Sequence, residues 1–106
     1  MTGVQTCALP ISAFLKSFKA AYGESNPDPY SIYGYEAGKL VLDTIKAGGT
    51  SRETFVTKLF ETKDRSSVLG TYSIDKNGDT TLTDYGLYTV GKDGNPTFSK
   101  AIKATA

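Results

Sequence analysis

The hydrophobic period of the chain changes once, between residues 63 and 67. Before this point apolar residues recur at the spacing of helices, and after it the residue types favour strands. The pattern predicts an α/β chain with three helices followed by two or three strands. A two-stranded sheet is only marginally stable by itself, and a two-layer domain needs more strands. The order of elements therefore predicts an incomplete piece of a larger fold.

Three segments have the spacing of amphipathic helices. The first two are residues 12–22 and 30–47, and the glycines at 23 and 48–49 are expected to end them. A capping box formed by Thr50 and Glu53 is expected to begin the third, because each side chain can accept a free first-turn N–H. The predicted buried face of this third helix consists of Phe55, Val56, Leu59 and Phe60.

The strand candidates are residues 68–74 and 82–90, which are rich in Tyr, Thr, Val, Ile and Leu. The turn between them is Asp75–Asp79, and residues 92–95 form a second turn around Asp93-Gly94. The tail from Pro96 is expected to be short and frayed.

Composition excludes several classes of function. The net charge is +1 and the basic residues are scattered among the acidic ones, so nucleic-acid binding has little electrostatic support. No window approaches the roughly 18–20 apolar residues of a membrane span. The sequence contains no histidine, and its single cysteine cannot form an internal disulfide. We therefore expect a protein that is not an enzyme and that has no cofactor and no metal.

Two acidic patterns have simple structural interpretations. Asp75, Asn77 and Asp79 imitate the start of a calcium-binding loop, but Thr80 replaces the required sixth-position glycine and Gly86 replaces the twelfth-position glutamate. A polar turn explains this segment without a metal, although a small calcium-binding module stays open as a remote alternative. Glu36 and Asp43, seven residues apart and flanked by lysines, are expected on a solvated helix face.

The first eleven residues fit neither a helical nor a strand pattern. Residues 2–11, TGVQTCALPI, resemble the in-frame translation of a sequencing-library adapter. We expect residues 1–11 to be an artefact outside the fold, with the reading frame shortened at this end. The alternative is a genuine N-terminal strand.

Several motifs occur in one order with consistent spacing: PYSIYGYEA at 29–37, the capping-box helix, GTYSIDKNGD at 70–79 and YGLYTV at 85–90. Together they resemble the C-terminal part of the leucine/isoleucine/valine-binding proteins, the periplasmic receptors of ABC importers. The resemblance covers residues 12–104. It implies a piece of the two-lobed type I periplasmic-binding-protein fold, with residues 12–82 in the N-terminal lobe and 83–106 forming the final crossover and a strand of the second lobe.

The resemblance also implies roles for individual residues. Tyr30, and more weakly Tyr33, match a wall of the ligand pocket, whereas the groups that hold the ligand's charged ends have no counterpart in this chain. Helix-entry packing for Tyr30 and core packing for Tyr33 are the structural alternatives. Asp79, Leu82 and Asp84 match the hinge, where short extended segments can absorb the φ/ψ changes of lobe closure.

The implied function is a receptor that binds branched-chain or related amino acids by lobe closure and delivers them to the membrane subunits of an ABC importer. Its expected location is the periplasm or the cell surface as a lipoprotein. The alternative is a ligand-sensing domain of a receptor or regulator on the same fold. We expect the isolated chain to bind no amino acid measurably and to be poorly stable, because its strands lack sheet neighbours.

Overall fold

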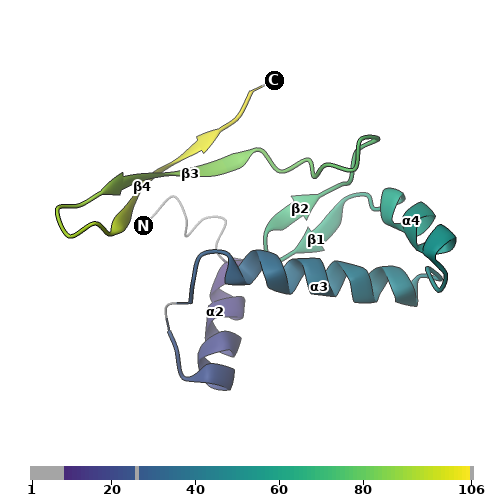
Figure 1. The fold of residues 1–106 in the computed structure, drawn as a ribbon, viewed down its shortest axis with the longest axis horizontal. Coiled ribbons are helices and arrows are strands. Elements are labelled where there is room, and N and C mark those ends of the chain that lie inside the picture. The colour runs from purple at the N-terminus through teal and green to yellow at the C-terminus, as the bar shows by residue number, and fades with distance from the viewer. Residues whose placement is uncertain (1–8, 26, 106) are drawn as a thin grey trace. The chain divides into compact units, whose positions relative to one another are not determined.

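The computed structural model describes residues 9–25 and 27–105, which divide into two compact units. One unit is Pro10–Leu82 and contains the helices and a short hairpin, and the other begins at Thr83 and contains a longer hairpin (Figure 1). The expected order of helices first and strands afterwards is confirmed.

Helix α2 (Leu9–Tyr22) begins three residues earlier than the predicted start at residue 12. Proline is accepted in the first turn of a helix, where its missing N–H has no intrahelical acceptor, so Pro10 does not block this start. Residues 9–11 are therefore helical, and the rest of the predicted artefact, residues 1–8, lies outside the described residues. Gly23 follows α2 with φ 74°, and its N–H donates to the Lys19 carbonyl at 2.8 Å.

Helix α3 (Ser31–Lys46) ends in a complete Schellman motif. The N–H of Gly48 donates to the Ile45 carbonyl and the N–H of Gly49 donates to the Thr44 carbonyl, both at 3.0 Å. Gly48 has φ 110°, in the left-handed region that favours glycine. A Cβ at Gly49 would lie 2.9 Å from the Phe55 Cα, so the second glycine allows the chain to pass close to the next helix. The predicted stop at residues 48–49 is confirmed.

Helix α4 (Arg52–Phe60) has a capping box, but one residue later than predicted. Ser51 Oγ accepts the Thr54 N–H at 3.2 Å, and Thr54 Oγ1 accepts the Ser51 N–H at 3.0 Å. The pair predicted from Thr50 and Glu53 is wrong because Thr50 and Ser51 are both good N-cap residues, and the tight glycine turn before them selects the second. The predicted buried face is only partly covered: Phe55 and Leu59 are half-buried, whereas Val56 is 48% and Phe60 is 45% exposed.

Two short strands, β1 (Arg65–Ser67) and β2 (Gly70–Tyr72), form an antiparallel hairpin. The predicted strand at 68–74 is therefore divided, because its first residues make the turn between β1 and β2. The predicted turn at Asp75–Asp79 is present, closed by a bridge between Ile74 and Thr80 rather than by two full strands. In this turn the Asp75 N–H donates to the Asp79 carbonyl at 2.8 Å.

The second unit is an antiparallel hairpin of β3 (Asp84–Val90) and β4 (Pro96–Lys103). The expectation of a frayed tail is wrong, since the tail forms the longer of these two strands. Pro96 is tolerated because it is the first residue of its strand. Gly94, with φ 78°, shapes the connecting turn. The register shifts between Leu87 and Tyr88, which leaves Ser99 as an extra residue opposite them.

Burial is sparse throughout the described chain. Tyr72 is the one buried apolar side chain among the described residues, at 3% exposure. The other buried side chains there are polar, Glu36 and Thr44, and both lie on α3. Two of the three fully buried side chains among the described residues of the first unit are therefore polar, although polar groups are costly to bury.

Candidate functional site

The predicted ligand-wall residues lie side by side at the start of α3. Tyr30 is the N-cap residue and Tyr33 lies in the first turn. Their ring centroids are 6.2 Å apart, with the ring planes tilted by 47°. Tyr30 is 78% exposed and Tyr33 is 52% exposed. The sequence also allowed Tyr33 to be a core residue. At this exposure Tyr33 is not packed in a core formed by the described residues.

The turn before α3 fixes the position of Tyr30. The Tyr30 N–H donates to Asp28 Oδ1 at 2.9 Å, and the Ser31 N–H donates to the Asp28 carbonyl at 2.9 Å. Asp28 thus caps the helix entry from two residues away, while the Tyr30 side chain makes no capping hydrogen bond. The result is an exposed aromatic surface with two phenol groups, which can contact an apolar ligand group and donate hydrogen bonds at its edge.

A buried polar cluster lies one turn further along α3. Glu36 Oε1 accepts two hydrogen bonds, one from Arg65 Nε at 2.5 Å and one from the Tyr72 hydroxyl at 2.8 Å. Arg65 Nη1 donates to Asp43 Oδ2 at 3.0 Å. We call Glu36, Asp43, Arg65 and Tyr72 the α3 anchor, because these four residues join α3 to both strands of the β1–β2 hairpin.

The anchor changes the proton affinities of its members. Burial lowers the pKa of Arg65, but its hydrogen bonds to Glu36 and Asp43 outweigh burial and leave the pKa raised. Burial, followed by the hydrogen bond to Glu36, raises the pKa of Tyr72 to about 12. The hydrogen bond from Arg65 holds the pKa of Asp43 below its usual range. The phenol of Tyr72 therefore stays protonated, and Arg65 stays charged, at neutral pH.

The expectation that Glu36 lies on a solvated helix face is wrong. Glu36 is 2% exposed, whereas Asp43 lies nearer the surface and also pairs with Lys39 at 3.9 Å. Two carboxylates seven residues apart lie on the same side of a helix, and one arginine from another element contacts both. The sequence signal that could have revealed this is Glu36 itself, which stands between Tyr35 and Ala37, since an acidic residue among apolar ones requires a partner.

The predicted hinge residues lie where the two units meet in sequence. Leu82 is the last residue of the first unit, and Asp84 is the first residue of β3, opposite Lys103. The N–H of Asp79 donates to Asp75 Oδ1 at 3.0 Å, which makes Asp79 part of the polar turn. The structure does not test a hinge role for these residues, and the role stays a prediction.

The Asp75 turn also explains the pattern that imitates a calcium loop. Asp75 Oδ1 accepts the N–H groups of Asn77 at 2.8 Å and of Asp79 at 3.0 Å, so the carboxylate serves the turn itself. Within residues 9–25 and 27–105, no three acidic, histidine or cysteine side chains form a group that could hold a metal ion. The same described residues contain no helix that is long and apolar enough to cross a membrane.

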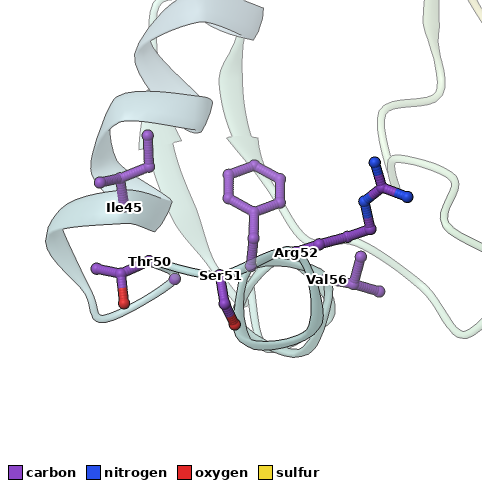
Figure 2. A pocket seen from close by; sticks show the side chains of 7 residues that line it. Ile45, Thr50, Ser51, Arg52 and Val56 are labelled. Atoms are coloured by element: carbon purple, nitrogen blue, oxygen red, sulfur yellow. The ribbon is translucent and has the colours of Figure 1, made fainter.

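An open hollow lies between the end of α3 and the start of α4 (Figure 2). Ile45 and Thr50 lie on one side of it, and Arg52 and Val56 extend from α4 on the other. Ser51, Phe55 and Gly49 complete the lining. The hollow is mainly apolar and shallow, and none of the predicted ligand residues lines it.

The fold is a partial piece of a periplasmic-binding-protein-like α/β fold, and its described residues form three helices and four strands in two small antiparallel sheets. The solved structure that carries this conclusion is a leucine-binding protein from Thermotoga maritima. It matches with a TM-score of 0.68 and 26% sequence identity over 87% of this chain. The match spans 26% of the length of the Thermotoga protein. No protein-family model and no curated protein matches the chain.

Proposed function

We propose that this chain is part of a solute-binding receptor that takes up branched-chain or related amino acids by closing two lobes around them. The observation that carries the proposal is the structural match to a leucine-binding protein over 87% of the chain. A receptor of this kind works outside the cytoplasm and presents its closed form to the membrane subunits of an ABC importer. Binding of ligand shifts the balance between open and closed forms.

In this proposal Tyr30 and Tyr33 form one wall of the ligand pocket. The exposed aromatic surface at the start of α3 supports this role, because two neighbouring aromatic side chains that are 78% and 52% exposed offer apolar area to a ligand. The chain spans about a quarter of the length of the leucine-binding protein it matches. The remaining walls, including the groups for the ligand's carboxylate and ammonium, belong to other parts of such a receptor.

Reconstitution of a complete receptor tests the proposal. The Thermotoga leucine-binding protein is prepared without the quarter matched by this chain, and the missing quarter is supplied as a separate polypeptide. Conditions are first set so that the Thermotoga protein's own quarter restores leucine binding in calorimetry. We expect this chain to restore binding of leucine, isoleucine or valine under the same conditions, and the chain by itself to bind none of them.

Two results would contradict the proposal. One is failure of this chain to restore binding where the native quarter succeeds. The other is micromolar leucine binding by this chain alone, which would show a different kind of site. Tyr30→Ala should weaken restored binding by roughly tenfold, because it removes one aromatic contact worth about 1 kcal/mol or slightly more. The matched control is Tyr22→Ala, a tyrosine of similar exposure on α2.

A further inference from the structure

The rotation of α3 about its own axis decides where the Tyr30–Tyr33 pair faces. Among the apolar side chains of α3, Val41, Leu42 and Ile45 are 43%, 65% and 44% exposed. They lie within about 100° of one another on the side of the helix away from Glu36, whereas Ile32 and Leu40 are half-buried on the Glu36 side. The buried side chains of α3 are instead Glu36 and Thr44. The hydrogen bonds that join α3 to both strands of the β1–β2 hairpin therefore meet at a fully buried polar side chain, Glu36.

The α3 anchor has the geometry that such a role requires. Glu36 Oε1 is held by β1 through Arg65 and by β2 through Tyr72, so two strands act on a single carboxylate oxygen. Arg65 reaches a second point on the same helix, Asp43, two turns away. Turning α3 by one residue moves a side chain by about 100° around the axis, which would break all three hydrogen bonds together.

The anchor is also a costly way to hold a helix in place. Glu36 Oε2 is buried and has no hydrogen-bond partner among the described residues. A buried acceptor without a partner carries a desolvation penalty, and buried ion pairs often contribute no more to stability than well-packed apolar groups of similar volume. Local rules of this kind are broken at functional sites, where orientation matters more than stability.

We propose that Glu36 is a positioning residue for the ligand wall, and that with Arg65 and Tyr72 it sets the direction in which Tyr30 and Tyr33 face the ligand. Tyr33 lies three residues before Glu36 on the same helix, so the orientation of one determines that of the other. Glu36 touches no ligand in this account and acts through α3. The expected effect on ligand binding rests on the proposed receptor function. The orientation of α3, by contrast, can be measured without any ligand.

The test replaces the buried polar groups by apolar ones of similar size, in the triple variant Glu36→Leu/Arg65→Met/Tyr72→Phe. This variant leaves no buried charge behind, so we expect the unit to stay folded. The orientation of α3 relative to β1–β2 is measured from residual dipolar couplings of the isotopically labelled chain, alone and in the reconstituted receptor. We expect helical chemical shifts to persist while the couplings of α3 depart from the wild-type orientation. Leucine binding in the reconstituted receptor should weaken at least tenfold.

Glu36→Gln is the conservative comparison, because its amide oxygen can still accept hydrogen bonds from Arg65 and Tyr72. It should keep the wild-type couplings and lose less than threefold in leucine affinity. A triple variant with wild-type couplings and affinity would overturn the proposal. So would a triple variant that loses its helical circular dichroism, since the anchor would then hold the unit folded rather than orient it. If the wild-type chain fails to restore leucine binding, the receptor function falls, and the couplings still decide the role of Glu36.

Discussion

The two units of the chain achieve regular structure by different means. The helical unit, Pro10–Leu82, has few buried side chains among the described residues, but one of them, Glu36, accepts side-chain hydrogen bonds from residues 29 and 36 positions further along the sequence. The hairpin unit has the longer strands, yet every residue of β3 is exposed. Its strands are joined by backbone hydrogen bonds, by the turn between them and by exposed cross-strand contacts such as that of Tyr88 with Phe98. Regular secondary structure is therefore no measure of how firmly a segment is held.

This difference predicts that single substitutions act strongly in the helical unit and weakly in the hairpin. Because we expect the isolated chain to be marginally stable, urea unfolding is best followed in a fixed concentration of trimethylamine N-oxide, which strengthens effective burial. Circular dichroism at 222 nm reports on the helical unit, and amide chemical shifts of β3 and β4 report on the hairpin.

The largest effect is expected from Arg65→Met. It removes one partner of a buried ion pair and leaves the Glu36 side chain, which is 2% exposed, without its cation, a change that typically costs about 3–5 kcal/mol. The helical signal should be lost or its urea midpoint should fall sharply, while the hairpin shifts stay unchanged. Arg52→Met, an exposed cation on α4, is the matched control and should change stability by less than about 0.5 kcal/mol. Equal effects of the two variants would refute the comparison.

The second effect is the alkaline loss of stability that arises from Tyr72. Its pKa of about 12 in the folded unit lies above the ordinary value of 10. The stabilisation is therefore fully present below pH 10 and is lost as the pH rises through 12, by up to about 3 kcal/mol. Urea midpoints measured across this interval should fall for the wild type and fall less for Tyr72→Phe. Tyr85→Phe in the hairpin should keep the full alkaline loss, and a flat profile in the wild type would contradict the assignment.

A smaller loss is expected from Gly49→Ala, where the new Cβ would lie 2.9 Å from both the Phe55 Cα and the Thr44 carbonyl oxygen. Both atoms belong to the backbone, so the connection between α3 and α4 must shift, at a cost of about 1–3 kcal/mol. Gly38→Ala within α3 meets nothing within 4 Å and should stabilise the helix by about 1 kcal/mol. Because Gly49→Ala should lower stability and Gly38→Ala should raise it, the two variants can be told apart even in a marginally stable protein.

The smallest effect is expected from Phe98→Ala in β4. Its ring lies edge-on to Tyr88 with centroids 5.7 Å apart, and loss of such a cross-strand pair costs about 1 kcal/mol. Amide shifts of β3 should move toward unfolded values while the helical signal stays constant. A drop in the 222 nm signal of the same size as that of Arg65→Met would show that the two units unfold together.

The features that the sequence predicts best depend on a few adjacent residues. The stops at Gly23 and at residues 48–49, and the turn at Asp75–Asp79, follow from glycine conformation and aspartate side-chain hydrogen bonds, which need no distant partner. The Tyr30–Tyr33 pair is a candidate for a different reason, the resemblance of the motif at 29–37 to the leucine/isoleucine/valine-binding proteins, and its role in ligand binding stays a prediction. The same local chemistry gave the α4 cap only to within one residue, because Thr50 and Ser51 compete for it.

The features that the sequence does not predict depend on residues far apart. Nothing near Glu36 indicates that its partners are Arg65 and Tyr72, so its flanking lysines suggested solvent instead. Strand β1 is polar and short, and β4 begins with a proline, so neither has the composition of a strand. Both segments form strands because a neighbouring strand pairs with their backbone N–H and C=O groups. This pairing depends on the folded chain and not on the residue types of the segment itself.

The irregular pairing of the long hairpin has a consequence for how this chain behaves among its own copies. Among the described residues, each strand of the β3–β4 sheet has one side without a strand partner, and such a side can recruit further chains into aggregates. The extra residue at Ser99 bends and twists β4, Pro96 withholds one N–H, and Lys100 and Lys103 add like charges. A second hairpin would meet a curved, positively charged strand with a missing donor, which disfavours stacking into fibrils and helps keep the exposed strands soluble.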